Sequence, residues 1–123
     1  MPENIIELIK SEVKPGTVIP KPDAKADFIV KSWGKRRGEE ALIYSIPNHT
    51  NPSKPHQKGI NASEWKKAYL QLTTGEEFDK DWFERNLPGC AEEGDCNFTT
   101  IGGIFALLGL SEYERGIYRL RKR

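Results

Sequence analysis

Apolar and polar positions alternate along the chain with periods that predict several short helices and strands. Near the N-terminus, the apolar residues between Glu3 and Val13 recur at nearly helical spacing, which predicts an amphipathic helix. Two later runs, Phe28–Val30 and Ala41–Ile46, are rich in the β-branched and aromatic residues typical of strands. A basic, glycine-bracketed segment, Gly34–Gly38, separates these runs. We therefore expect a β-hairpin with a basic tip.

The middle of the chain predicts a long polar loop followed by a helix. Pro47–Gly59 is polar and rich in proline, and loops of this length are usually functional or mobile. A helix then begins at Asn61, because Glu64 three residues later completes a capping box with Asn as the cap. Gly75 ends it as a residue suited to a left-handed C-terminal cap. The buried stripe of this helix has the i, i+3, i+4, i+7 spacing and comprises Trp65, Ala68, Tyr69 and Leu72.

The last third of the chain predicts two more helices and a C-terminal strand. Aromatic residues from Phe78 onward indicate a second helix that ends at Pro88–Gly89, and Cys90–Cys96 reads as a short acidic loop. An almost wholly apolar third helix follows over Phe98–Leu110. Tyr113–Leu120 is expected to be extended, with a turn or bulge at its glycine.

Together these elements predict one α+β domain over residues 1–123. It would comprise an N-terminal helix, a β-hairpin, three helices and a final strand that joins the hairpin in a small antiparallel sheet. Three helices followed by a basic extended segment resemble a winged helix, in which the third helix enters the major groove of DNA. A winged-helix-like architecture is therefore our interpretation of the fold.

The third helix supports two interpretations. A recognition helix needs polar side chains for base edges, and here only Asn97, Thr99 and Thr100 of the first turn could reach a groove. A helix that is apolar all round is usually a buried core helix instead. The small residues Gly102, Ala106 and Gly109 share one face, which would let another backbone approach closely.

Charge is distributed unevenly along the chain, although the net charge is only +1. The net charge is +4 for residues 1–75, −6 for residues 76–95 and +3 for residues 96–123. Basic groups at the hairpin tip, in the long loop and in the C-terminal strand could contact phosphates, which gives affinity without sequence information. The candidate basic contacts are Lys35, Arg36, Arg37, Lys54, Lys58, Arg115, Arg119 and Arg121.

The sequence gives little reason to expect metal or catalytic chemistry. Cys90 and Cys96 lie six positions apart and His49 and His56 seven, which does not match the tight ligand pairs of structural zinc sites. We expect free thiols in a reducing cytoplasm, because neither a signal peptide nor a membrane-spanning apolar run is evident. We assign no catalytic residue, metal or cofactor. A small hydrolase or nuclease using either histidine is the remaining enzymatic alternative.

The sequence therefore predicts a non-enzymatic binding module that contacts the nucleic-acid phosphate backbone. The alternative is a protein-interaction or self-associating domain, in which the acidic 76–95 segment of one molecule meets basic segments of another. Exposed tryptophans would then be natural anchors.

Overall fold

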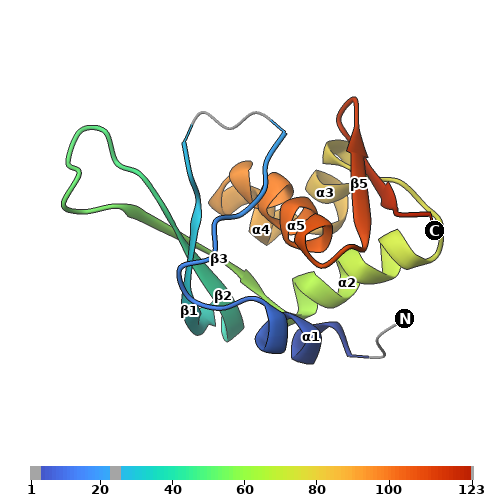
Figure 1. Cartoon of the computed structure of the whole chain (residues 1–123), viewed down its shortest axis with the longest axis horizontal. Helices are drawn as coiled ribbons and strands as arrows, with labels where there is room; N and C mark the ends of the chain where they lie inside the picture. The colour runs from blue at the N-terminus through green and yellow to red at the C-terminus, as the bar shows by residue number, and fades with distance from the viewer. Residues whose placement is uncertain (1–3, 23–25, 123) are drawn as a thin grey trace.

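The computed structural model describes residues 4–22 and 26–122, which form a small α+β domain (Figure 1). The helices are α1 (Ile5–Glu12), α2 (Ala62–Thr73), α3 (Lys80–Asn86), α4 (Pro88–Glu93) and α5 (Cys96–Leu107). The strands are β1 (Ile29–Arg36), β2 (Glu39–Ile46), β3 (His56–Asn61), β4 (Phe78–Asp79), β5 (Ser111–Glu114) and β6 (Ile117–Leu120). No helix in the described part of the chain is long and apolar enough to cross a membrane.

The expected hairpin is present, but it belongs to a three-stranded antiparallel sheet with the order β1-β2-β3. Its strands are longer than predicted and meet at a tight turn formed by Arg37 and Gly38. The expectation of an unstructured loop through Gly59 is wrong, because the loop ends at His56 and β3 pairs with β2. The strand was missed because its first four residues are polar or glycine, and only Ile60 has an apolar side chain.

The C-terminal strand does not join this hairpin, contrary to the sequence-based expectation. The β5–β6 hairpin pairs instead with the two-residue strand β4, in a second antiparallel sheet with the order β4-β6-β5. Phe78 opposes Tyr118 in the register, and both side chains are buried. Their rings lie 6.1 Å apart, and both contact Phe98 of α5. Burial of this aromatic cluster explains why the strand pairs here.

The first two helices lie within one or two residues of their predicted starts, α1 beginning at Ile5 and α2 at Ala62, directly after the predicted cap Asn61. The Asn4 side chain accepts hydrogen bonds from two backbone amides at the start of α1. The capping box of α2 is confirmed, since Asn61 and Glu64 each accept a hydrogen bond from the other's backbone amide. The predicted stripe of α2 is buried at Trp65, Ala68 and Leu72, and the chain leaves the helix through Gly75 at a φ of 85°.

Two predictions for the segment before α5 need correction. Phe78 lies in β4 rather than in a helix, so α3 begins at Lys80 with Asp79 as its N-cap. Residues 90–93, expected in a loop, belong to α4. Pro88 is the first residue of this helix, where a backbone amide has no partner within the helix, so the missing amide hydrogen of proline costs nothing. Sequence reasoning treated this proline as a helix terminator, whereas here it also starts a helix.

Helix α5 is the centre of the core, as the second interpretation of the third helix predicts. It lies between the β1-β2-β3 sheet and β5 (Figure 1), and its residues from Asn97 to Phe105 are buried except Thr99. Its glycines permit close packing. A Cβ at Gly102 would lie 2.2 Å from the Tyr118 ring, and one at Gly103 would lie 2.0 Å from the backbone oxygen of Pro20. The close backbone approach therefore occurs at Gly103, and not on the face formed by residues 102, 106 and 109.

Candidate nucleic-acid interface

Two Arg–Gly turns carry the basic residues of most interest. Arg37–Gly38 joins β1 to β2 with φ angles of 51° and 79°, and Arg115–Gly116 joins β5 to β6 with φ angles of 49° and 85°. Positive φ at both central positions is typical of a type I′ hairpin turn, which favours Asn, Asp or Gly. A left-handed conformation costs an ordinary residue about 1–2 kcal/mol. Each arginine therefore occupies a position that its backbone disfavours.

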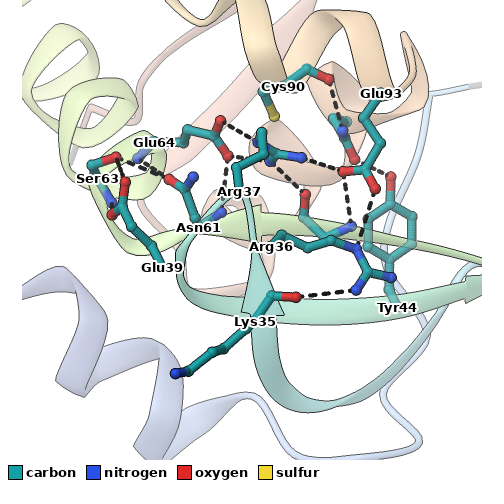
Figure 2. Close-up of polar contacts among 12 residues, drawn as sticks. Lys35, Arg36, Arg37, Glu39, Tyr44, Asn61, Ser63, Glu64, Cys90 and Glu93 are labelled. Carbon is teal, nitrogen blue, oxygen red and sulfur yellow. Dashed lines mark hydrogen bonds and ion pairs between the residues drawn. The ribbon is translucent and has the colours of Figure 1, made fainter.

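The Arg37 side chain offsets this strain with four polar contacts inside the protein (Figure 2). It grips the Glu64 carboxylate in a bidentate manner, with Nε–Oε2 at 3.1 Å and Nη2–Oε1 at 2.6 Å. It also contacts Glu93 Oε1 at 2.5 Å and the Gly59 carbonyl oxygen at 2.9 Å. Burial alone would lower the pKa of Arg37, but the hydrogen bonds that it donates to Glu64 and Glu93 outweigh this effect and raise the pKa. The guanidinium stays charged and occupied.

Arg36 and Lys58 belong to the same network, which we call the Glu93 clamp: Arg36, Arg37, Lys58, Glu64 and Glu93. Arg36 Nε lies 3.2 Å from Glu93 Oε2, and Lys58 Nζ donates to the Glu93 backbone oxygen at 2.6 Å. Glu93 also accepts from the amide of Gly59, on the outer edge of β3, at 3.4 Å. The clamp ties the hairpin turn to β3, α2 and α4, and it protects an exposed strand edge. Three of the predicted phosphate contacts, Arg36, Arg37 and Lys58, therefore already have partners within the protein.

The C-terminal basic residues differ in their availability. Arg119 Nη2 lies 2.7 Å from Glu77 Oε2, and its Nη1 lies 3.5 Å from Glu114 Oε1. The side chains of Arg115 and Arg121 are exposed and make no hydrogen bond or ion pair with any residue that the structure describes. Arg115 thus stands in a strained turn without the compensation that Arg37 has.

The remaining basic candidates, Lys35 and Lys54, do not form a continuous basic surface with Arg115. Lys35 and Lys54 are exposed, and Lys35 points away from the Glu93 clamp (Figure 2). The loop that carries Lys54 and the β5–β6 hairpin lie toward opposite ends of the long axis of the molecule (Figure 1). The basic segments therefore do not form one continuous surface.

The polar residues proposed to enter a groove are mostly inside the protein. Asn97 and Thr100 are both 0% exposed. The Asn97 side chain accepts a hydrogen bond from Tyr44 Oη at 2.5 Å and donates one to the Cys90 carbonyl oxygen at 2.9 Å. Thr99 is half-buried, and its hydroxyl donates to the backbone of Cys96. The expectation that Asn97 and Thr100 reach a groove is wrong, because the first turn of α5 packs against the β1-β2-β3 sheet.

Both cysteines are free thiols, and they face different surroundings. Cys90 is 0% exposed beside the Arg37–Glu64 pair (Figure 2), where burial and the negative charge of Glu64 raise the pKa of the thiol. Cys96 is partly exposed, with Sγ 3.3 Å from Tyr44 Oη. Because the single Tyr44 proton is donated to Asn97, the Tyr44 oxygen is free to accept from the Cys96 thiol.

This difference predicts selective thiol chemistry. At pH 8 and without denaturant, we expect a thiol-specific chromogenic reagent to modify Cys96 readily and Cys90 slowly, since a raised pKa lowers the thiolate fraction and burial blocks access. Denaturant should expose both thiols. A Cys96→Ser variant should lose the rapid native reaction, whereas Cys90→Ser should keep it. Equal rates for both thiols in the folded protein would contradict this assignment.

Sequence reasoning overlooked Tyr113 as a candidate contact. The side chain is 42% exposed on β5, two residues before Arg115. The available signal was the interleaving of tyrosine with arginine in the C-terminal segment, a combination suited to stacking and phosphate binding. Its exposure could be learned only from the structure, because the equivalent Tyr118 on the paired strand is 1% exposed.

The described residues offer no metal centre: within them, no three His, Cys, Asp or Glu side chains come close enough together to hold an ion. His49 and His56 are both exposed in or next to the long loop. Comparison of the chain with protein-family models, with curated proteins and with solved structures finds no match.

Proposed function

We propose that this chain is a non-enzymatic binding module that contacts nucleic-acid phosphates through its β5–β6 hairpin. The observation that carries the proposal is Arg115, an exposed arginine at the tip of this hairpin with a φ of 49° and no partner among the described residues. Its turn conformation would suit glycine better, and its guanidinium is available to a ligand. An exposed guanidinium is well suited to phosphate oxygens.

Topology supports a winged-helix-like assignment for residues 62–120. The order is helix α2, strand β4, helices α3 to α5, and then the hairpin, with β4 pairing to the last strand in the order β4-β6-β5. A winged helix has this strand order, with the final hairpin as its wing. The short helix α4 is an addition to that plan, and the buried α5 departs from a recognition helix. The wing is therefore the element that we propose meets nucleic acid, with Arg121 at its base as a second contact.

Replacing Arg115 by glycine tests this function without weakening the fold. Glycine relieves the left-handed strain, so stability should stay unchanged or rise by up to about 1 kcal/mol. Binding of a labelled generic duplex, followed by fluorescence anisotropy at about 50 mM salt, should weaken about fivefold, as one exposed ionic contact is worth about 1 kcal/mol. The slope of log affinity against log salt should fall by about 1.

Arg85→Gln is the matched control, because Arg85 is exposed on α3 and pairs with Asp81 within the same helix. Its loss removes the same charge from a helix outside the hairpin and should leave binding unchanged. If wild-type protein binds neither the duplex nor a matching single strand at about 50 mM salt, or if Arg115→Gly binds as well as wild type, the proposal is wrong.

A second candidate function is a protein-interaction domain, favoured by exposed apolar side chains around α1. Leu70 and Leu107 are 63% and 44% exposed. Leu70 borders a groove of about 510 Å³ between α1 and α2, and Leu107 borders one of about 430 Å³ between α1 and the end of α5. Failure of nucleic-acid binding together with self-association would favour this function. A dimer that salt dissociates would join acidic and basic segments, and one that salt strengthens would join the apolar grooves.

A further inference from the structure

A small apolar pocket lies beside the wing, between α5 and the segment that precedes β1. It measures about 190 Å³, and the ammonium of Lys21, the one charged group of its lining, lies over the Phe28 ring. The lining comprises Pro20, Lys21, Pro22, Gly103, Ala106, Tyr113 and Tyr118. Pockets for drug-sized ligands measure about 300–1,000 Å³, so this one is suited to a single flat ring. Its apolar lining favours stacking over polar recognition.

The aromatic wall of the pocket is rigidly supported. Tyr113 opposes Tyr118 across the hairpin, with ring centroids 4.9 Å apart. The Tyr118 ring packs directly on Gly102 of α5, which supports it on the side away from solvent. Tyr113 keeps 42% of its surface exposed and so offers a fixed aromatic surface to an incoming ring. The Tyr118 hydroxyl is buried without a hydrogen-bond partner among the described residues.

Arg115 lies close enough to this wall for one nucleotide to reach both. Two extended residues span about 7 Å, which brings the guanidinium within reach of a phosphate whose base contacts Tyr113. Glu112 and Glu114 flank Tyr113 in sequence, and side chains alternate along a strand, so both carboxylates belong to the other face of the hairpin. There they line a second hollow with Arg119, which Tyr113 also borders. Glu114 pairs there with Arg119.

We propose that this pocket receives one unstacked nucleobase, which stacks on Tyr113 while Arg115 holds a neighbouring phosphate. The inference rests on the proposed function and adds a preference for single-stranded or locally unpaired nucleic acid. Stacking on an aromatic side chain is tolerant of sequence, because every base has a π-face. The pocket therefore selects unpaired bases over base pairs and makes little distinction among the four bases.

The test compares two labelled strands of equal length, an oligothymidine and an abasic strand with the same phosphates. Anisotropy at about 50 mM salt should show the oligothymidine binding about tenfold more tightly, within the range measured for base–aromatic stacking. Equal affinity for the two strands overturns the pocket inference but leaves the phosphate-binding function standing. Failure of both strands to bind overturns the proposed function itself.

Two variants locate the preference at this pocket. Tyr113→Leu keeps an apolar contact with Tyr118 but removes the stacking surface, and Ala106→Met fills the pocket from α5. Each should abolish the tenfold preference and leave affinity for the abasic strand unchanged. A circular dichroism melt of each variant checks the fold. If both folded variants retain the preference, the base binds elsewhere and the inference is wrong.

Discussion

Replacing Gly103 by alanine should reduce the free energy of unfolding by about 3 kcal/mol, at the upper end of what overpacking usually costs. The added Cβ would lie 2.0 Å from the Pro20 carbonyl oxygen and 3.1 Å from Ile19 Cγ2. A backbone oxygen cannot rotate away as a side chain can, and Ile19 is itself only 2% exposed. The chain around residue 20 would have to move off α5. Urea unfolding followed by circular dichroism measures the effect.

Gly109→Ala is the matched control for this substitution. Gly109 follows the same helix at a φ of 76°, and a Cβ there would meet nothing within 4 Å. Its replacement should therefore cost only the strain of a left-handed residue, about 1 kcal/mol. If Gly103→Ala unfolds at the same urea concentration as the control, Pro20 does not pack on α5 as described.

The parts of the fold that the sequence predicted are those determined locally. The capping box at Asn61 and Glu64 needs only four neighbouring residues, and the stripe of α2 follows from one helical period. The β1–β2 hairpin likewise depends on two adjacent apolar runs and the turn between them. The burial of α5 could be inferred because no side chain after Thr100 in that helix is polar.

The parts that were missed depend on partners far away in the chain. Strand β3 has one apolar side chain, and it is recognised only by its pairing with β2. The second sheet forms because Phe78 and Tyr118, forty positions apart, are buried together against α5. The spacing of glycines predicted that another backbone approaches α5 closely, but it did not identify the glycine at the contact. The approaching residue, Pro20, belongs to a segment without helical or strand periodicity, so the sequence gives no sign of where that segment packs.

The candidate site shows the same limit. A sequence identifies cations but not the carboxylates that neutralise them. Arg37 and Arg115 share the same Arg–Gly turn with nearly the same φ angles, yet the first pairs with Glu64 and Glu93 and the second pairs with no residue that the structure describes. Glu64 lies 27 positions from Arg37, and Glu93 lies 56 positions away. Only the tertiary arrangement separates a structural arginine from one available to a ligand.

Replacing Arg37 by asparagine should reduce the free energy of unfolding by about 3 kcal/mol, although asparagine suits the turn better than arginine does. The loss follows from Glu64, whose side chain is 9% exposed and would lose its bidentate partner. Removing one partner of a buried ion pair costs about 3–5 kcal/mol, and the 25% exposure of the Arg37 side chain places this pair at the lower end of that range. The Gly59 carbonyl oxygen at the edge of β3 would also lose its donor. Urea unfolding at pH 7 measures the difference.

Arg115→Asn provides the matched comparison, because it makes the same substitution in the same type of turn without an ion-pair network. Its stability should equal or slightly exceed that of the wild type, so the difference between the two variants isolates the Glu93 clamp from the turn itself. Adding Glu64→Gln to Arg37→Asn should recover part of the loss, since the uncompensated charge is then removed. If the two asparagine variants are equally stable, the clamp contributes nothing beyond the turn, and Arg37 would be as free to contact a ligand as Arg115.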